Sequence, residues 1–450
     1  MSNYVNKVIE ETKIKNSLEP EFLQTVEEVL SSLAPCIDAN PDYEKEGILE
    51  RMVEPERVIL FKVPWIDDNG KVQVNRGYRI QFNGAIGPYK GGLRFSPTVN
   101  LSILKFLAFE QTFKNSLTTL PIGGGKGGSD FEPKGKSDRE IMRFCQSFMQ
   151  ELYRHIGPDT DCPAGDIGVG GREIGYLFGE WRKLSTAYAN GALSGKALPY
   201  GGSLLRPEAT GYGAVYYLES VLKDAKDTIS GKKVVISGYG NAAWGATKKL
   251  TELGAKVIAF SGSAGYVLDE AGVNTPEKIE YMYDIRVKRQ HTMKDYADKF
   301  GAKFFPNEKP WGVDCDIYMP CATQNEVNID DAKKILNSNA KYYMEVSNMP
   351  TTNDALKLML DKKDFVVGPA KAVNAGGVSV SALEMSQNAE KLTWSAEQVD
   401  KELHRIMSDI YNNSKNAAAK YGLGYNLVAG ANIAGFEKVA QSMLAQGIAW

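Results

Sequence analysis

Hydrophobic residues recur at helical spacing near the beginning of the chain. In the stretch EFLQTVEEVLSSLAPCI, residues 21 to 37, apolar side chains stand three and four positions apart at Phe22, Val26, Val29, Leu30 and Leu33. This spacing gathers them on one face of a helix. We therefore predict that about the first 60 residues are mainly helical.

Alternation replaces the helical spacing in RVILFKVPWIDDNGKVQVNRGYRIQFN, residues 57 to 83. Two extended runs flank Asp68-Asn69-Gly70, and Asn-Gly is a strong signal for a hairpin turn. We expect a sheet of mixed or antiparallel kind here. A helix is predicted from Leu101 to Leu117, and it places Gln111 and Lys114 three positions apart on one face.

A βαβ pattern follows a boundary near the stretch YGGSLLRPEATGYG. An apolar strand (233–237), a glycine turn, a helix (about 242–253) and a second apolar strand (256–260) come in order. Gly238, Gly240 and Ala243 fit the G-x-G-x-x-[GA] pattern, which lets a pyrophosphate approach the backbone at a helix N-terminus. Alone this match is weak, since a tight turn and a helix start also explain it.

Further strand-like runs, DCDIYMP, KYYMEVS and DFVVGPA, alternate with helical segments. Such alternation is typical of a doubly wound parallel sheet. The sequence therefore predicts an α/β protein of two domains: an N-terminal α/β domain, and a Rossmann-type dinucleotide-binding domain that begins at about residue 201.

Composition narrows the functional classes. The 450 residues are 43% hydrophobic and 24% charged, so the chain can bury sizeable cores in two or three domains. A net charge of -2 gives a nucleic-acid partner no compositional support. We see no apolar run long enough to cross a membrane and expect no membrane association. The polar, charged N-terminus leads us to expect no signal peptide.

The five cysteines are scattered and odd in number, without C-x-x-C spacing. This suits a reducing compartment, so we expect a cytoplasmic protein. With only three scattered histidines, the chain gives no sign of a metal site, and we predict none.

The stretch LPIGGGKGGSD surrounds Lys126 with five glycines. It is not a phosphate loop of the G-x-x-x-x-G-K-[ST] type, because Gly127 stands where Ser or Thr belongs. Most lysines are simply exposed charges, and that alternative applies to Lys90, Lys114 and Lys126 alike. A lysine without neighbouring side chains, however, can be enclosed by backbone and lose hydration, which lowers its pKa toward the range of a general acid or base. We therefore interpret the glycines as room for close packing around one functional ammonium.

Six motifs, in this order, carry a resemblance that covers essentially the whole chain. They are GPYKGGLRF, LTTLPIGGGKGGSDF, PAGDIGVG, RPEATGYG, MPCATQNEV and KAVNAGGVSVSALEMSQN. Together they resemble the glutamate dehydrogenase family, in its smaller hexameric form. The resemblance implies reversible oxidative deamination of L-glutamate to 2-oxoglutarate and ammonia with NAD or NADP. It also implies that the C-terminal helices return to the first domain, which gives 1–200 plus 425–450 as the substrate and oligomerisation domain and 201–424 as the dinucleotide-binding domain.

The resemblance also implies roles for individual residues. Lys126 would be the catalytic lysine that polarises the 2-oxo group and activates water, and Asp166 would exchange protons with the amino group. Lys90 and the Ser381 hydroxyl would bind the distal carboxylate, and Lys114 would hold the α-carboxylate with its neighbours. The implied substrate-binding residues are Lys90, Gly91, Gln111, Lys114, Ala164, Arg206, Val378 and Ser381. Two lysines for two carboxylates suit a dicarboxylic substrate in charge.

The implied cofactor contacts lie in the second domain. They are Thr210, Gly238, Tyr239, Gly240, Asn241, Ala242, Ser261, Ala322, Thr323, Asn348 and Asn374. After the second strand of the βαβ unit the sequence reads AFSGSAGY, with no acid before Asp269 to repel a 2'-phosphate. Charge alone therefore tolerates either cofactor. Tyr239 and Gly262 resemble the NAD-linked members of the family, although those members often have an acid where this chain has Ala264. We therefore predict NAD as the preferred cofactor, with measurable use of NADP.

Two alternatives remain open. A leucine- or phenylalanine-type dehydrogenase would keep Lys114, Lys126 and Asp166 but would have no use for a cation and a hydroxyl at the distal end. An inactive amino-acid or nucleotide binder would not need the catalytic side chains that this chain retains.

The resemblance to the glutamate dehydrogenase family also leads us to expect a homohexamer.

Overall fold

The computed structural model describes residues 3–186, 188–287 and 291–448. By its contacts the chain divides into two compact units. Unit 1 comprises residues 1–204, 378–399 and 432–450, and unit 2 comprises 205–377 and 400–431. The contacts thus group 378–399 with the N-terminal residues, whereas the sequence analysis assigned them to the dinucleotide-binding domain. The reason is that this helical segment packs on loops that precede residue 204, as described below.

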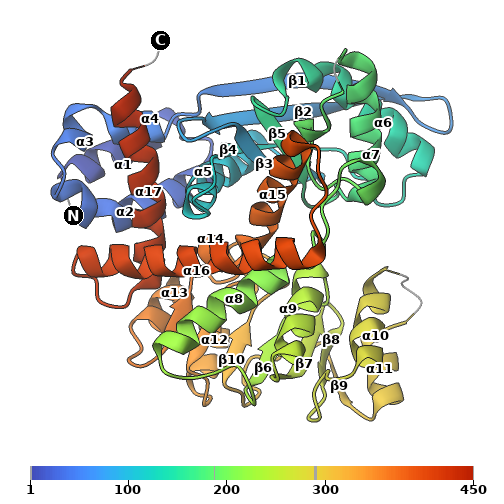
Figure 1. Cartoon of the computed structure of the whole chain (residues 1–450), viewed down its shortest axis with the longest axis vertical. Coiled ribbons are helices and arrows are strands. Elements are labelled where there is room, and N and C mark those ends of the chain that lie inside the picture. Colours follow the sequence, from blue (N-terminus) through green and yellow to red (C-terminus); the bar gives the residue numbers. More distant parts are fainter. Residues whose placement is uncertain (1–2, 187, 288–290, 449–450) are drawn as a thin grey trace. The chain divides into compact units, whose positions relative to one another are not determined.

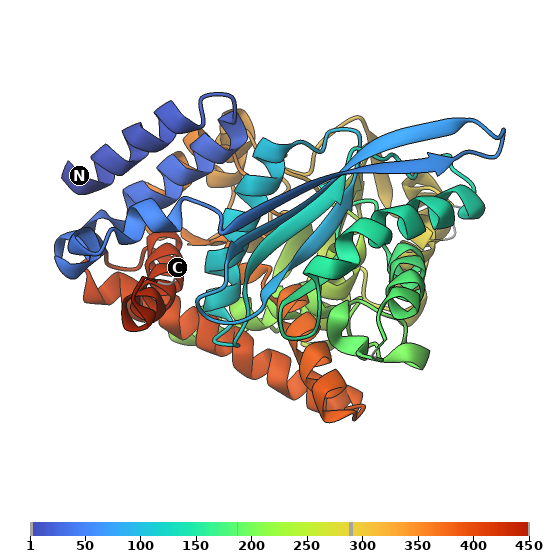
Figure 2. The ribbon, with the colours of Figure 1, turned by 90° about the horizontal axis from the view of Figure 1, so that it is seen from above.

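Unit 1 is built on a five-stranded mixed sheet with the order β1-β2-β4-β3-β5. Strands β1 and β2 form the predicted antiparallel hairpin, a long ribbon in Figure 2, and β4 is parallel to β3, which is in turn parallel to β5. The strands are β1 (Arg57–Ile66), β2 (Val72–Asn83), β3 (Tyr89–Phe95), β4 (Gly123–Ser129) and β5 (Asp161–Gly165).

Helices surround this sheet. The predicted helical beginning is confirmed as four helices, and the helix predicted over residues 101 to 117 is present with the same bounds. They are α1 (Asn3–Lys15), α2 (Pro20–Asp38), α3 (Asp42–Lys45), α4 (Ile48–Met52), α5 (Leu101–Leu117), α6 (Asp138–Leu152) and α7 (Gly171–Leu184), with short 3-10 turns at η1 (Tyr153–His155), η2 (Asn190–Ala192) and η3 (Leu198–Tyr200). Between the sheet and α6, a cluster of aromatic rings forms the core, in which Phe131 stacks on Phe144 at 3.8 Å between ring centroids. This rigid core fixes the strands that carry the candidate residues.

Unit 2 contains a seven-stranded sheet with the order β12-β11-β10-β6-β7-β8-β9. The five strands from β12 to β7 are parallel, as a doubly wound sheet requires, and β8 and β9 add an antiparallel edge. The strands are β6 (Lys233–Ile236), β7 (Lys256–Gly262), β8 (Gly265–Leu268), β9 (Lys303–Pro306), β10 (Ile317–Met319), β11 (Tyr342–Met344) and β12 (Val366–Gly368).

In unit 2 one helix precedes the first strand, and the other helices alternate with the strands along the chain (Figure 1). In chain order these helices are α8 (Ala209–Asp224), α9 (Asn241–Glu252), α10 (Pro276–Val287), α11 (Met293–Phe300), α12 (Ile329–Leu336), α13 (Asn353–Leu360) and α14 (Ala370–Val373). The predicted βαβ unit is confirmed as β6, α9 and β7. Three C-terminal helices cross between the two units along the sequence: α15 (Gly376–Glu390), α16 (Ala396–Lys420) and α17 (Leu427–Gln446).

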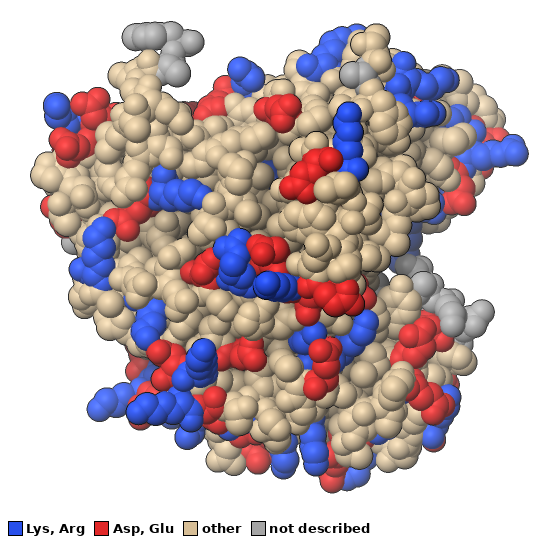
Figure 3. Space-filling view, in the orientation of Figure 1, with Lys and Arg blue, Asp and Glu red and all other residues tan. Residues whose placement is uncertain are grey.

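The surface carries charges of both signs. Over the face drawn in Figure 3, basic and acidic side chains are intermixed, in keeping with the small net charge of -2. Within the described residues, each helix is too short or too polar to span a bilayer. The same residues contain no group of three or more His, Cys, Asp or Glu side chains that could hold a metal ion.

Candidate active site

The glycine tract around Lys126 is not a loop but strand β4, which is buried between β2 and β3. Side chains would not fit there. A Cβ on Gly91 of β3 would lie 1.6 Å from the carbonyl oxygen of Gly125, and a Cβ on Gly124 would lie 2.0 Å from Oγ1 of Thr112 on α5. The glycines therefore let β3 and α5 pack directly on the backbone of β4, which agrees with the interpretation that they make room around one lysine.

Lys126 is 4% exposed and faces the carboxylate of Asp166, the residue after β5. Its Nζ lies 3.2 Å from Oδ2 of Asp166, which follows β5, and Arg94 Nε donates to the same oxygen at 2.8 Å. Gly92 leaves room for this contact, since a Cβ on it would lie 2.8 Å from Cβ of Asp166. Two cations and one carboxylate thus meet at a position where Lys126 is buried and Arg94 and Asp166 are partly buried.

The electrostatics of this group follow from burial and charge. Burial lowers the pKa of the Lys126 ammonium, the charge of Asp166 opposes that shift, and the balance leaves the pKa below its ordinary value. Burial alone would raise the pKa of the Asp166 carboxyl, but Lys126 and Arg94 outweigh it and hold the pKa at about 2. At neutral pH Asp166 is therefore a carboxylate, and Lys126 gives up its proton more readily than an exposed lysine.

Lys90 occupies a second buried position in the same sheet. It is 1% exposed, and its Nζ donates to the carbonyl oxygen of Cys162 at 2.9 Å and to Oγ of Ser194 at 2.7 Å. The Ser194 N–H donates in turn to the carbonyl oxygen of Pro163 on β5 at 2.9 Å. Ser194 was not predicted from the sequence, because its position between Leu193 and Gly195 carries no recognisable motif.

The other substrate candidates of unit 1 lie on α5, β5 and α15. Gln111 and Lys114 are half-buried on α5, and Gln111 Nε2 donates to Oδ1 of Asn115 at 2.6 Å. A Cβ on Gly91 would lie 3.5 Å from Cγ of Gln111, so these two candidates are neighbours. Ala164 is buried in β5 next to the Lys90 strand, where it pairs with Gly92.

Val378 and Ser381 stand three positions apart in α15, Val378 half-buried and Ser381 buried. Arg206 belongs to unit 2, where it lies with Thr210 beside Gly377. A Cβ on Gly377 would be 2.6 Å from Oγ1 of Thr210 and 3.7 Å from Nη1 of Arg206. The structure thus places Gly91 beside Gln111 and against the strand of Lys126 in unit 1, and Arg206 near Thr210 in unit 2.

The candidate dinucleotide site in unit 2 begins at the turn after β6. Gly238 has φ +81°, a conformation that favours glycine, and Gly240 is the residue before the N-terminus of α9 at Asn241. The Tyr239 ring covers Gly262 at the end of β7, where a Cβ would lie 2.4 Å from Cε1 of the ring. The open N–H groups of α9 and its positive dipole end therefore face the turn.

Glu326 fixes a second loop of this site, and the sequence analysis missed it. Its Oε1 accepts from the N–H groups of Ala322 at 3.0 Å and Thr323 at 3.2 Å. Oγ of Ser237, at the end of β6, accepts from the N–H of Cys321 at 2.8 Å. Burial raises the pKa of Glu326. A glutamate three positions after Thr323 could have been noticed as a loop acceptor, although nothing in the local sequence indicates that it is half-buried.

Two asparagines of the candidate dinucleotide site contact each other, Asn348 after β11 and Asn374 after β12. Asn374 Nδ2 donates to Oδ1 of Asn348 at 2.9 Å. Asn374 is 3% exposed, and its Oδ1 has no hydrogen-bond partner among the residues that the structure describes. A buried acceptor of this kind is costly unless a ligand donor meets it.

At the end of β7 Ser261 is buried, whereas Ser263 and Ala264 are exposed. Asp269, the first acid after the strand, is committed elsewhere. It accepts from Lys278 Nζ at 2.6 Å and from the Tyr296 hydroxyl at 2.9 Å.

Comparisons with known proteins agree with this arrangement. Residues 55–183 match the Glu/Leu/Phe/Val dehydrogenase dimerisation domain, and residues 201–447 match the Glutamate/Leucine/Phenylalanine/Valine dehydrogenase family. The chain is 65% identical to the NAD-specific glutamate dehydrogenase of Clostridium symbiosum, over 100% of both chains. It is 55% identical to the NADP-specific glutamate dehydrogenase of Haemophilus influenzae, over 96% of each chain.

Solved structures give the same result. One glutamate dehydrogenase superposes with a TM-score of 0.98 at 65% identity, over 100% of both chains. The hetero-hexameric glutamate dehydrogenase from Thermus thermophilus superposes with a TM-score of 0.80 at 26% identity, over 90% of this chain and 93% of that one.

Proposed function

This chain belongs to the glutamate/leucine/phenylalanine/valine dehydrogenase family, and from that premise we propose which of its residues carry the reaction. It is a glutamate dehydrogenase, which converts L-glutamate reversibly to 2-oxoglutarate and ammonia with a nicotinamide cofactor. The predictions of family, fold class and activity are confirmed. The observation that carries the assignment of residues is the contact of Lys126 with Asp166 inside the glycine strand, at 3.2 Å.

Lys126 and Asp166 are assigned to the reacting atoms. Asp166, already a carboxylate at neutral pH because its pKa is about 2, accepts a proton from the α-ammonium of glutamate. Lys126 polarises the 2-oxo group and activates the water that replaces the amino group. Its lowered pKa suits this exchange, because a general acid or base works best when its pKa lies near the operating pH.

The two carboxylates of glutamate are assigned to two lysines. Lys90 with the Ser381 hydroxyl binds the distal carboxylate, and Lys114 with Gln111 and the Gly91 backbone binds the α-carboxylate. Charge-assisted hydrogen bonds of this kind are about twice as strong as neutral ones, so they orient the substrate as well as hold it. Val378 contacts the methylene groups, and the other proposed substrate-binding residues are Ala164 and Arg206.

The cofactor is NAD, with NADP as a second possibility, since relatives of both kinds exist. When bound, the nicotinamide accepts the α-hydrogen of glutamate as hydride. Two features of unit 2 fit this group. The tight turn at Gly238 before the N-terminus of α9 suits a pyrophosphate. Oδ1 of Asn374, which no described residue meets with a hydrogen bond, suits an amide donor. The proposed contacts are Thr210, Gly238, Tyr239, Gly240, Asn241, Ala242, Ser261, Ala322, Thr323, Asn348 and Asn374.

The chain self-associates through the family's dimerisation domain, residues 55–183, and we assign it a homohexamer. The hetero-hexameric relative from Thermus thermophilus supports the number of subunits. The edge strand β1 supports the surface: Val58 and Leu60 on β1 are exposed on the same side of the hairpin as Val74 on β2, and such a face is usually covered. A 49 kDa species in sedimentation at micromolar concentration would contradict the assembly.

No disulfide joins the five buried cysteines, which supports a cytoplasmic location.

One spectrophotometric assay tests the proposed function. The chain should oxidise NADH in the presence of ammonia and 2-oxoglutarate, and the 2-oxo acids of leucine and phenylalanine should be poor substitutes. A leucine- or phenylalanine-type dehydrogenase would show the reverse preference. A chain that binds NADH, followed by its fluorescence, without any turnover would instead be an inactive binder.

A further inference from the structure

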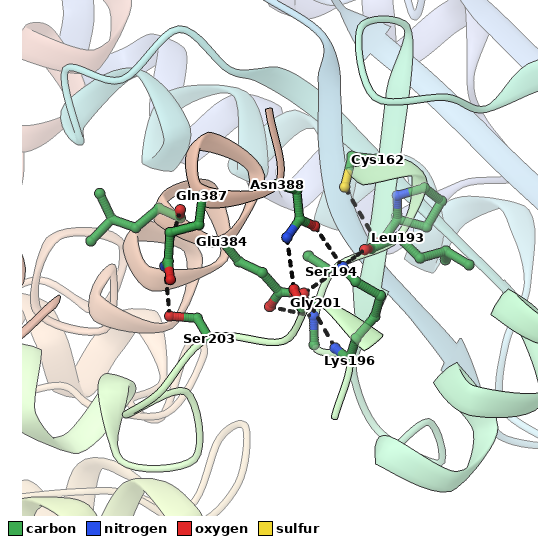
Figure 4. A network of polar contacts seen from close by, with 12 residues as sticks. Cys162, Leu193, Ser194, Lys196, Gly201, Ser203, Glu384, Gln387 and Asn388 are labelled. Atoms are coloured by element: carbon green, nitrogen blue, oxygen red, sulfur yellow. Dashed lines mark hydrogen bonds and ion pairs between the residues drawn. The ribbon is translucent and has the colours of Figure 1, made fainter. Parts of the chain in front are cut away.

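A fully buried ion pair joins Lys196 and Glu384. Neither residue has a role in the proposed reaction of glutamate. Both side chains are 0% exposed, and Lys196 Nζ lies 2.6 Å from Oε1 of Glu384 (Figure 4). Lys196 Nζ also donates to Oδ1 of Asn388 at 3.0 Å and to the carbonyl oxygen of Leu193. The three protons of the ammonium are therefore all used.

The carboxylate of Glu384 is satisfied as well. Its Oε2 accepts from the Gly195 N–H at 2.9 Å, and its Oε1 accepts from the Lys196 N–H at 3.3 Å. Further along, Asn388 Nδ2 donates to the carbonyl oxygen of Gly201 at 2.7 Å, and Gln387 Nε2 donates to Oγ of Ser203 at 2.9 Å. One face of α15 is thus tied to the segment 193–203, and both belong to unit 1.

Each residue of this pair lies near a group that we have assigned to the distal carboxylate, Lys90 through Ser194 and Ser381 along α15. Lys196 is two residues after Ser194, whose Oγ is 2.7 Å from Lys90 Nζ. Glu384 is one helical turn after Ser381 on α15, so the two side chains lie on the same face of the helix. The backbone N–H of Gly195, which adjoins Ser194, is held directly by Glu384.

We propose that the Lys196–Glu384 pair is a positioning device for substrate specificity. It holds the Ser194 segment against α15, and so sets the spacing between Lys90 and the Ser381 hydroxyl to that of a carboxylate. The proposal rests on the proposed function, because it deepens the assignment of Lys90 and Ser381. Neither Lys196 nor Glu384 touches the substrate in this account.

The physical case against a purely stabilising role is that buried ion pairs rarely stabilise a fold more than apolar residues of equal size do. What such a pair does supply is a fixed geometry, because the ammonium protons and carboxylate oxygens of the pair all have partners, and a shifted arrangement would leave a charge unpaired. A carboxylate held by two groups needs that geometry, whereas a methyl group in the same place does not.

The test compares glutamate with norvaline, which has the same chain length but lacks the distal carboxylate. In the double variant Lys196→Met/Glu384→Met both charges are removed together, so no buried charge is left alone. We expect KM for glutamate to rise at least tenfold, about 1.4 kcal/mol, with kcat changed less than threefold. KM for norvaline should change less than twofold. Should the double variant fail to fold, Lys196→Gln/Glu384→Gln also removes both charges but keeps hydrogen-bonding groups in place, and it should change KM in the same direction.

A matched control removes a buried ion pair elsewhere. Lys278 and Asp269 of unit 2 are also 2.6 Å apart and nearly buried. Lys278→Met/Asp269→Asn should lower the melting temperature and leave the preference for glutamate over norvaline unchanged at saturating cofactor.

The outcomes separate the two proposals. If the folded Lys196 and Glu384 variants keep the wild-type preference for glutamate, or lose both substrates equally, the positioning role is wrong while the glutamate dehydrogenase assignment stands. If the wild-type chain turns over no glutamate at all, the proposed function fails, and the positioning role falls with it.

Discussion

Glycines crowd two places in this molecule, strand β4 of unit 1 and the turn between β6 and α9 of unit 2. In β4, Gly124 has no positive φ, and what it provides is the absence of a side chain, as the 2.0 Å approach of a Cβ on Gly124 to Thr112 shows. In the turn, Gly238 provides a backbone conformation, φ +81°. The same residue therefore serves close packing around a lysine in one unit and access to a helix N-terminus in the other.

This difference explains why the glycine turn of unit 2 matches a general sequence motif, whereas the glycine tract of β4 does not. The turn of unit 2 follows a known spacing, because a pyrophosphate always needs the same small set of backbone positions. The glycines of β4 follow no general spacing, since their positions are set by close contacts with particular residues of β3 and α5. Substitutions in the two regions should affect different properties: turnover, substrate preference, thermal stability and affinity for the cofactor.

The largest effect should come from Lys126→Ala. General acid and base catalysis and electrostatic stabilisation are each worth factors of about 100 to 1000, so turnover should fall by several orders of magnitude. Circular dichroism and NADH fluorescence should report an intact fold and nearly unchanged cofactor binding. A purified variant with more than a tenth of wild-type turnover would show that Lys126 does no chemistry.

Lys90→Leu combined with Ser381→Val should change specificity. Removing the partners of the distal carboxylate should lower the ratio of kcat/KM for glutamate to that for norvaline by about 100-fold, since the loss of charge-assisted bonds affects only the dicarboxylic substrate. Lys105→Leu is the control, because Lys105 is a buried lysine of unit 1 that pairs with Glu19 on the opposite side of α5 from the candidates. An unchanged ratio in the double variant would remove Lys90 and Ser381 from the site.

Gly124→Ala should destabilise unit 1 through packing alone. Its Cβ would meet Thr112, and overpacking of this kind costs about 1 to 3 kcal/mol. Gly179→Ala makes the same change in α7, where a Cβ meets nothing within 4 Å, and should instead stabilise by about 0.5 to 1 kcal/mol. Thermal unfolding measures both. Equal shifts of melting temperature would mean that the glycines of β4 are not required by their neighbours.

Gly238→Ala should weaken cofactor binding. A positive φ costs a residue with a Cβ about 1 to 2 kcal/mol, so the turn should relax to another conformation when the cofactor is absent. Binding must then restore the turn, and affinity for NADH should fall about tenfold by fluorescence titration. The preference for glutamate over norvaline should stay as in the wild type, because that property belongs to unit 1. A changed preference with unchanged NADH affinity would invert the assignment of the two glycine regions.

The smallest effect concerns the choice between cofactors. Ala264 is exposed at the end of the β7 hairpin, and Ala264→Asp adds a charge that repels a 2'-phosphate. The kcat/KM ratio of NAD to NADP, which should already favour NAD in the wild type, should rise several-fold at low salt and less at high salt. A wild-type ratio that favours NADP tenfold would show that groups outside this strand end bind the phosphate.

Local pattern was sufficient for most of the fold. The apolar spacing of α2, the Asn-Gly hairpin of β1 and β2, and the βαβ unit at β6, α9 and β7 were all predicted, because each is specified by residues adjacent in sequence. Pattern failed for α15, which the contacts group with unit 1 rather than with the dinucleotide-binding unit. Helical spacing says that a helix exists and which face is apolar, but it does not say which domain that face meets.

The candidate residues divide in the same way. Sequence by itself identified Lys126, Asp166 and Lys90 as candidates, because charged side chains flanked by glycine are unusual and because the motifs around them resemble one family. Only the tertiary structure brought Arg94 to the Lys126–Asp166 contact and paired Lys196 with Glu384, which are 188 positions apart. Neither Lys196 nor Glu384 stands out in its own neighbourhood. A buried charge is recognisable only through the partner that neutralises it, and that partner is chosen by the way distant segments pack.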